Sequence, residues 1–390
     1  MRINTGAALS PSDVVGRGRV IAQLWRDLDN QSVVLNAERR MGKTSLIKKM
    51  CAESPTDVIA LYRDLENIQT PEAFLEAILA DLHEQLPDKR RAKEMFLRLR
   101  ESLGGVEIKG IFKLPPAQQR DWELTLKTIL VETAQAVEGR IVFFWDEIPL
   151  MLDNMKRGKN GAAVAMQVLS ALRAIRHDDK TKSIRMVFTG SIGLHHILTE
   201  LRGKGLNHPA INDMSSELLP PLSEEDAVNL VTALLAGANI PVSGSKAQEI
   251  AASVDNIPFY IQHLAKGVRD HQNGADVALA NIPELRYKLL YSPQDPLYLR
   301  HYRERIEIYY AKKEGETAFL ILDALAHEQP LLVDTLLNRV KLKAPKTKEQ
   351  SLFEILELLE QDLYIERSAR GYQFQRNFIR DAWKALRNIA

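Results

Sequence analysis

The stretch from Ser32 to Met50, SVVLNAERRMGKTSLIKKM, constrains the fold more than any other part of the 390-residue chain. It begins with the apolar run Val33–Leu35, which predicts a buried strand, and it continues from Lys43 as an amphipathic helix. The turn between them contains Gly-Lys-Thr. In such a strand–turn–helix unit the backbone N–H groups surround phosphate groups, and the helix dipole adds positive charge. The sequence therefore predicts a phosphate-binding loop.

The predicted loop is a continuous run of residues. They are Ala37, Glu38, Arg39, Arg40, Met41, Gly42, Lys43, Thr44 and Ser45. We expect Lys43 to reach the β- and γ-phosphates of a nucleotide and the Thr44 hydroxyl to bind Mg²⁺. Ala37 stands where the usual pattern has its first glycine, and alanine fits that turn if its φ angle is negative. The alternative is an ordinary strand–helix turn that carries a lysine.

The composition is that of an ordinary globular protein. Apolar residues make up 45% and charged residues 26%, and the length allows two or three domains. The formal net charge is +1, so binding to nucleic acid must depend on a local basic patch. The single cysteine, Cys51, excludes an intramolecular disulfide. No run approaches the roughly 18 apolar residues of a membrane span. No signal peptide is found either, so we expect a cytoplasmic protein without a membrane partner.

A second part of the site follows another predicted strand. The run Ile141–Trp145 is bulky and apolar, which is typical of a strand buried on both faces of a parallel sheet. Asp146 and Glu147 follow at its carboxyl end, where open α/β sheets bind their ligands. We expect Asp146 to hold Mg²⁺ and Glu147 to orient and deprotonate an attacking water. The alternative is that the two carboxylates cap the turn before Pro149.

Two further segments carry candidate site residues. The predicted strand Ile184–Phe188 is followed by a turn in which Thr189 and Ser191 are candidates to contact the γ-phosphate or the attacking water. A plain strand-to-helix turn is the alternative there. Ahead of the loop, Gly16 and Arg17 open a helix, either as a simple helix entry or as a turn around the base and ribose of a nucleotide.

The segment of residues 85–117 is predicted to be an insertion on the core. Residues 88–100 are strongly basic, which indicates a solvated helical face or, as the alternative, a nucleic-acid patch. Residues 104–113 alternate like a short hairpin. A helix from about residue 118 to 138 then leads back to the core.

The C-terminal third is predicted to be mostly helical. Residues 223–312 show only helical periodicity, and helices follow at 317–327, 331–340 and 350–362. A hairpin of residues 364–367 and 372–375 precedes a closing helix, and this order is typical of a winged helix-turn-helix. The candidate DNA contacts are Lys343, Lys346, Lys348 and Arg370. Residues 313–390 contain 12 Lys and Arg against 12 Asp and Glu. A protein-contact or autoinhibitory role therefore stays open beside DNA binding.

Together these motifs resemble the archaeal-type ATPase family, a branch of the STAND class of P-loop ATPases related to AAA+ proteins. The Arg-Arg-x-Gly-Lys-Thr-Ser form of the loop is the most specific element. The other motifs that carry the resemblance are Val15-Gly16-Arg17, Asp146-Glu147, Gly190-Ser191 and Asn256-Ile257-Pro258-Phe259-Tyr260.

The resemblance implies an α/β P-loop core with a five-stranded parallel sheet in residues 1–220, a helical lid with linker helices in 221–312, and a winged helix in 313–390. It implies an ATP and Mg²⁺ site between core and lid, with Gly16, Arg17 and Pro258 near the adenine. It also suggests a slow ATPase that acts as a nucleotide-controlled switch on a protein partner or on DNA, with nucleotide-dependent homo-oligomers compatible with that role. The alternatives are an AAA+-type regulator or loader that assembles on DNA, and a scaffold that holds nucleotide without turnover.

Overall fold

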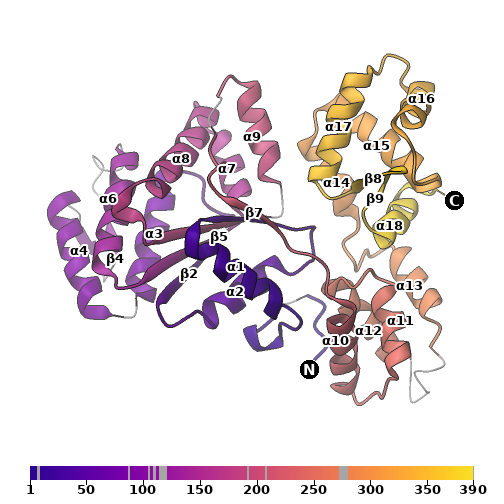
Figure 1. Cartoon of the computed structure of the whole chain (residues 1–390), viewed down its shortest axis with the longest axis horizontal. Coiled ribbons are helices and arrows are strands. Elements are labelled where there is room, and N and C mark those ends of the chain that lie inside the picture. Colours follow the sequence, from indigo (N-terminus) through magenta and orange to yellow (C-terminus); the bar gives the residue numbers. More distant parts are fainter. Residues whose placement is uncertain are drawn as a thin grey trace. The chain divides into compact units, whose positions relative to one another are not determined.

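The structure, a computed structural model, describes residues 1–6, 9–86, 88–103, 106–108, 111–113, 121–190, 193–206, 209–271 and 280–389. The chain divides into two units, which are described separately (Figure 1). The first, here called the sheet unit, comprises Ser10–Ala37 and Lys43–Leu219. The second, the helical unit, comprises Met1–Leu9, Glu38–Gly42 and Pro220–Ala390. Residues 38–42 of the predicted phosphate loop therefore belong, by their contacts, to the helical unit.

The sheet unit is organised around a parallel sheet that has five strands in the described part of the chain. The strands are β1 (Val33–Asn36), β2 (Val58–Asp64), β5 (Arg140–Asp146), β6 (Ile184–Thr189) and β7 (Ser215–Leu218). Their order is β2-β5-β6-β1-β7, and every neighbouring pair is parallel. Strand β6 lies between β1 and β5, and the carboxyl ends of these three strands meet at one edge, where such sheets bind ligands.

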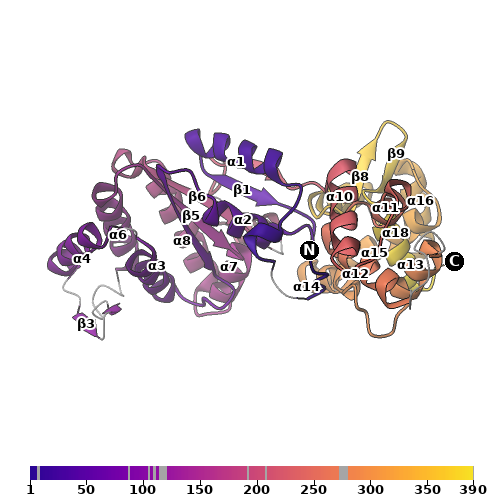
Figure 2. The same cartoon turned by 90° about the horizontal axis from the view of Figure 1, so that it is seen from below.

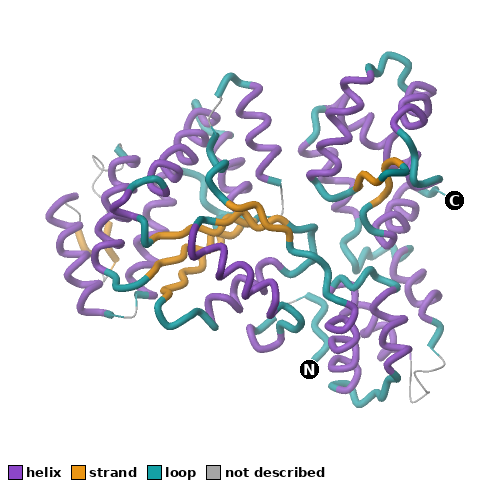
Figure 3. The backbone as a smooth tube through the Cα atoms, viewed as in Figure 1, coloured by secondary structure: helices purple, strands orange, loops and turns teal. Residues whose placement is uncertain are grey.

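Helices cover both faces of this sheet, as Figure 3 shows. The helices described in the sheet unit are α1 (Gly18–Asn30), α2 (Lys43–Ala52), α3 (Pro71–Gln85), α4 (Lys89–Leu103), α6 (Trp122–Ala136), α7 (Ile148–Lys156), α8 (Gly161–Arg176) and α9 (Leu194–Gly203), with short 3₁₀ turns at Pro11–Asp13 and Asp179–Thr181. Because both faces are covered, β5 is buried from Ile141 to Asp146, which confirms the prediction from its continuous apolar run. Trp145 is the centre of an aromatic core, with its ring 5.0 Å from that of Phe74 and 6.0 Å from that of Phe188.

The predicted insertion lies at the outer margin of the sheet unit. Figure 2 shows α4 beyond α6. Strands β3 (Val106–Ile108) and β4 (Ile111–Lys113) form the predicted antiparallel hairpin. The basic side chains of α4 are partly neutralised, since Arg91 pairs with Glu138 at 2.6 Å and Arg98 with Glu132 at 2.8 Å. These ion pairs favour the solvated-face interpretation over a nucleic-acid patch.

The helical unit consists mainly of helices. They are α10 (Glu224–Ala236), α11 (Gly244–Ala252), α12 (Pro258–His271), α13 (Ile282–Leu290), α14 (Arg300–Tyr309), α15 (Lys312–His327), α16 (Val333–Lys343), α17 (Glu349–Gln361) and α18 (Asn377–Arg387). Strands β8 (Ile365–Ser368) and β9 (Gly371–Phe374) form an antiparallel hairpin. Ser223 caps α10 by accepting a 3.1 Å hydrogen bond from the Asp226 N–H.

Two predicted helix boundaries in this unit are wrong. Helix α15 begins at Lys312 rather than at residue 317, because Glu314 accepts a hydrogen bond from the Ala311 N–H and caps an earlier turn. The next helix begins at Val333 rather than at residue 331, because Leu331 exchanges two backbone hydrogen bonds with Tyr372. That helix also runs on to Lys343, so Lys341 and Lys343 are helical rather than part of a loop.

The C-terminal elements are held together by a buried face of α18. Phe378, Ile379 and Trp383 are each about 1% exposed. The Trp383 indole N–H donates a 2.9 Å hydrogen bond to Asp323 in α15, which satisfies the polar atom of a large buried ring. In the part of the chain that the structure describes, no helix is both long and apolar enough to cross a membrane.

Candidate functional site

Three predicted site residues meet at the carboxyl edge of the sheet. Thr44 lies in the first turn of α2, Asp146 is the last residue of β5, and Thr189 is the last residue of β6. The Thr44 hydroxyl donates a 2.6 Å hydrogen bond to Oδ2 of Asp146. The Thr189 hydroxyl donates to Oδ1 of the same carboxylate. Asp146 is only 2% exposed, so these bonds satisfy a buried carboxyl group and hold it in a fixed orientation.

The oxygen atoms at this edge fit a divalent metal. Asp146 offers a carboxylate and Thr44 a hydroxyl, 2.6 Å apart. Mg²⁺ is a hard cation that takes oxygen ligands and is usually bound by one or two protein groups together with phosphate oxygens and water. The two residues that the sequence predicts as Mg²⁺ ligands are therefore brought together by the fold, and their chemistry suits that ion.

Lys43 lies across the base of the predicted phosphate loop. Its ammonium group donates a 2.9 Å hydrogen bond to the carbonyl oxygen of Ala37, and the residue is 8% exposed. The left-handed positions of the loop are Arg40, with φ of +73°, and Gly42, with φ of +88°. Ala37 is not among the described non-glycine residues with positive φ. The condition under which alanine can replace glycine is thus met.

Glu147 adopts an uncommon backbone conformation for a non-glycine residue. Its φ and ψ angles are 59° and 34°, in the left-handed region, and it immediately precedes α7. Its N–H donates a 3.1 Å hydrogen bond to Oδ1 of Asp146. Left-handed non-glycine residues are a small minority and gather at functional sites. The observed backbone therefore supports a specialised role for this glutamate.

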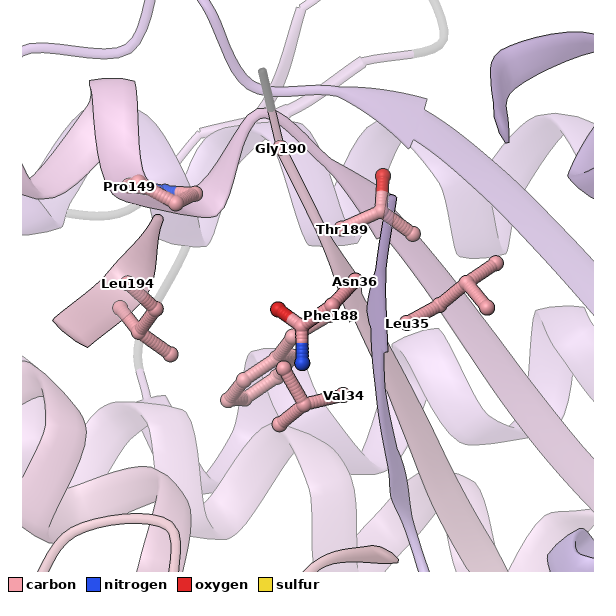
Figure 4. Close-up of a pocket in the computed structure, with 8 residues that line it drawn as sticks. All are labelled: Val34, Leu35, Asn36, Pro149, Phe188, Thr189, Gly190 and Leu194. Carbon is pink, nitrogen blue, oxygen red and sulfur yellow. The ribbon is translucent and has the colours of Figure 1, made fainter. Parts of the chain in front are cut away.

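A small pocket opens beside Thr189 at the ends of β1 and β6. Its lining residues are Val34, Leu35, Asn36, Pro149, Phe188, Thr189, Gly190 and Leu194. In Figure 4, Pro149 and Leu194 lie on one side and the residues of β1 and β6 on the other. Its volume of about 10 Å³ corresponds to roughly one water molecule. Asn36, which sequence reasoning missed, lines this pocket and donates a 3.0 Å hydrogen bond to Ser216. Its place directly after the apolar run of β1 is the signal that could have identified it.

The remaining predicted nucleotide contacts lie in separate parts of the fold. Gly16 has a φ of +70°, and Arg17, 4% exposed, is the N-terminal cap residue of α1. Ser45 is in the first turn of α2, and Pro258 is the first residue of α12 in the helical unit. The prediction at Ser191 falls outside the described residues.

The candidate DNA contacts lie around α17. Lys343 ends α16, and Lys346 and Lys348 follow in the connection to α17. Arg370 lies in the turn between β8 and β9. All four side chains are exposed.

The side chains of the loop residues Glu38 and Arg40 pack inside the helical unit, to which residues 38–42 belong. The Tyr302 hydroxyl, in α14, donates a hydrogen bond to Oε1 of Glu38, which is 3% exposed. Burial raises the pKa of Glu38 to about 7. The Arg40 guanidinium lies 4.4 Å from the ring centre of Phe259 and 4.5 Å from that of Tyr298. Sequence reasoning missed these partners, because Tyr302 follows Glu38 by 264 positions.

Comparisons with known proteins bear on the fold. No family profile matches the sequence, and no curated protein does. The Walker-type ATPase PABY2304 of Pyrococcus abyssi superposes with a TM-score of 0.64 at 16% identity, covering 98% of this chain and all of its own. The ORC2 protein of Aeropyrum pernix, solved as ADPNP–ADP complexes, superposes with a TM-score of 0.56 at 14% identity, covering 99% of this chain and 96% of its own. The chain therefore shares the fold of these two proteins.

The shared fold and the five-stranded parallel sheet confirm the predicted α/β fold class. In the strand order of this sheet, β6 separates β1, which precedes the predicted phosphate loop, from β5, which ends at Asp146. At identities of 16% and 14% the likeness extends to the fold alone. The function must therefore be argued from the residues of the site.

Proposed function

We propose that this protein is a Mg²⁺-dependent ATPase that works as a nucleotide-controlled switch. The observation that carries the proposal is the pair of hydroxyls, from Thr44 and Thr189, on the buried carboxylate of Asp146. These two hydrogen bonds join the first turn of α2, directly after the predicted phosphate loop, to the carboxyl ends of β5 and β6. The ADPNP–ADP complexes of the Aeropyrum pernix protein support a nucleotide as the ligand of such a fold.

Each residue has a distinct task in this proposal. Lys43 exchanges its bond to the Ala37 carbonyl for the phosphates, and Thr44 and Asp146 would hold Mg²⁺, which would neutralise phosphate charge when bound. Glu147 accepts a proton from water as the water oxygen bonds to the γ-phosphorus, and ADP leaves with the electrons of the broken P–O bond. Thr189 keeps Asp146 oriented.

The switch part of the proposal concerns the helical unit. In the proposed domain organisation, residues 1–220 form the ATPase core, residues 221–312 form a helical lid with linker helices, and residues 313–390 form a winged helix. The order α15, α16, α17, β8, β9, α18 supports the last assignment, because three helices followed by a hairpin are the elements of that motif. Turnover is expected to be slow, with the bound state acting on a partner.

The decisive experiment is phosphate release from ATP and Mg²⁺ by the wild type, Lys43→Ala and Glu147→Gln. We expect both variants to lose about 100-fold or more, the range typical of general-base and phosphate-clamp groups. Lys49→Ala is the matched control, because Lys49 lies in the same helix but pairs with Glu53. Equal rates in the wild type, Lys43→Ala and Glu147→Gln would overturn the proposal. If nucleotide binds but no phosphate is released by any of them, the protein is a nucleotide-holding scaffold.

A second candidate function is a DNA-binding regulator that assembles on DNA with ATP. The observation in its favour is the exposed basic group at the N-terminal end of α17 and at the hairpin turn. An N-terminal helix end is where a winged helix inserts base contacts. The acidic residues Glu354 and Glu357, exposed on α17 itself, oppose it.

Binding of a labelled duplex tests this second candidate. It is measured at 50 and 200 mM salt, with and without ATP, for the wild type and the double variant Lys346→Glu/Lys348→Glu. A DNA-binding role predicts affinity that falls steeply with salt and is lost in the variant, since phosphate contacts dominate such binding. No binding at the low salt concentration removes this candidate and leaves a protein partner.

A further inference from the structure

Glu38 occupies an unusual position for an acidic residue in a phosphate loop. Its side chain is 3% exposed, and its Oε1 accepts a hydrogen bond from Tyr302. Its second oxygen, Oε2, is buried without a hydrogen-bond partner among the described residues. A buried carboxylate with an unsatisfied oxygen is costly to keep ionised. Burial therefore favours the protonated form of the Glu38 carboxyl group, while the hydrogen bond from Tyr302 favours the ionised form.

Tyr302 connects this carboxylate to the C-terminal elements. Its hydroxyl lies 3.3 Å from that of Tyr260 in α12, and its backbone carbonyl accepts a 2.6 Å hydrogen bond from the Tyr364 hydroxyl. Tyr302, Tyr260 and Tyr364 are all nearly fully buried. Tyr364 directly precedes β8. One buried residue thus contacts the phosphate loop on one side and the start of the hairpin on the other.

The same region is reinforced by a buried ion pair. Arg305, one turn after Tyr302 in α14, donates a 2.9 Å hydrogen bond to Asp362, which also accepts a 2.7 Å bond from Tyr310. This pair fixes α14 against the end of α17 without touching Glu38. This ion pair and the hydrogen bond between Tyr364 and Tyr302 therefore both join α14 to the segment that ends α17 and begins β8.

We propose that Tyr302 is a positioning residue that holds the phosphate loop through Glu38 and couples the state of that loop to the elements that begin at Tyr364. This inference rests on the proposed nucleotide binding. In this inference Glu38 and Tyr302 are the pair of residues that senses the bound nucleotide. The Glu38 side chain accepts its hydrogen bond from Tyr302 and does not bind the phosphates.

The coupling follows from electrostatics. Phosphates in the loop repel a nearby carboxylate, so nucleotide binding favours the protonated form of Glu38. Protonation replaces a charge-assisted hydrogen bond from Tyr302 with a weaker neutral one. By linkage, a condition that protonates Glu38 must in turn strengthen nucleotide binding. The charged groups that face Glu38 from neighbouring elements are Arg305 of α14, Arg376 before α18 and Asp255 before α12.

The test measures the affinity of the full-length protein for the Mg²⁺ complex of a fluorescent N-methylanthraniloyl-ADP between pH 5.5 and 8.5. We expect wild-type affinity to fall on the order of tenfold as pH rises through 7, the factor that corresponds to displacing one pKa by one pH unit. In Glu38→Gln this pH dependence of the affinity disappears, and only the pH dependence that comes from the probe's own phosphates remains. In Tyr302→Phe the midpoint moves to higher pH, because the lost hydrogen bond had favoured the ionised form.

Tyr310→Phe is the matched control. It also removes a buried tyrosine hydroxyl that donates to a carboxylate, but its partner is Asp362. The pH at the midpoint of the affinity change should be the same in Tyr310→Phe as in the wild type. Hydrogen exchange of residues 364–375 supplies a second measurement, in which nucleotide changes protection in the wild type and in Tyr310→Phe but not in Tyr302→Phe.

The outcomes separate the two proposals. If the wild type binds no probe, nucleotide binding fails and this inference falls with it. If the wild type binds, Lys43→Ala does not, and the pH profiles of Glu38→Gln and Tyr302→Phe match the wild type, only this inference is overturned. Should Tyr302→Phe not fold, Glu38→Gln alone decides, since its amide oxygen can still accept from Tyr302.

Discussion

The hydroxyl of Thr44 donates a 2.6 Å hydrogen bond to Oδ2 of Asp146, a residue 102 positions later in the chain. This bond joins the first turn of α2 to the end of β5, although β1, the strand that precedes α2, is separated from β5 in the sheet by β6. The fold thereby brings together the two oxygen atoms best suited to share a divalent cation with a phosphate.

Removal of the Thr44 hydroxyl should uncouple nucleotide binding from Mg²⁺. We expect Thr44→Ala to bind the Mg²⁺–nucleotide complex about tenfold more weakly or worse, because bonds to charged groups are worth roughly 1.5–3 kcal/mol. Thr44→Ser, which keeps the hydroxyl, should stay close to the wild type. Titration with a fluorescent nucleotide, with Mg²⁺ and with EDTA, measures this. An equal Mg²⁺ dependence in wild type and Thr44→Ala would contradict the prediction.

Removal of only one partner of the buried ion pair between Arg305 and Asp362 should strongly destabilise the fold. Asp362→Leu leaves the Arg305 charge buried without its carboxylate partner, and we expect a loss of about 3–5 kcal/mol in the free energy of unfolding. The double variant Arg305→Met/Asp362→Leu should recover part of that loss, because no charge is then left buried. Urea unfolding compares the three proteins. A double variant less stable than Asp362→Leu would refute the argument.

Glu38 should make the protein less stable as pH rises. Burial raises its pKa from 4.5 to about 7, so the folded state binds the proton more tightly than the unfolded state. The stabilisation is fully present below pH 4.5 and is lost as pH rises to about 7. Glu38→Gln lacks this dependence. The free energy of unfolding of Glu38→Gln minus that of the wild type should therefore increase by roughly 3 kcal/mol from pH 4.5 to pH 8. Urea unfolding at both pH values measures the difference, and parallel profiles would contradict it.

Two buried histidines should act in the opposite direction at acidic pH. Burial lowers the pKa of His301 to about 3 and that of His263 to about 4. The unfolded state then binds more protons below pH 6.5, so stability falls as pH drops from about 6.5 toward 4 and below.

His301→Asn measures this acid effect. Relative to this variant, the wild type should lose about 2 kcal/mol between pH 6.5 and 5, the equivalent of 1.5 pH units for one group. His327→Asn, at an exposed position, is the control and should follow the wild type. An identical acid profile for wild type and His301→Asn would show that burial does not keep His301 neutral.

Local sequence patterns were sufficient for the sheet and for the Lys43, Thr44 and Asp146 positions. A bulky apolar run such as Ile141–Trp145 favours a strand covered on both faces, and Gly-Lys-Thr between a predicted strand and a predicted helix favours a phosphate loop. Helix ends were predicted less well. Leu331 leaves its predicted helix because Tyr372, distant in sequence, offers it two backbone hydrogen bonds, and no local pattern carries that information.

The amino-acid sequence thus determined which residues are the candidates for binding phosphate and metal, because short-range spacing sets which side chains share a strand end or a helix turn. The tertiary structure decided how those residues are held. It placed two threonine hydroxyls on Asp146, and it buried Glu38 under Tyr302. Such contacts depend on chain closure over 43, 102 and 264 positions, so the packing of the whole fold selects them rather than any local preference.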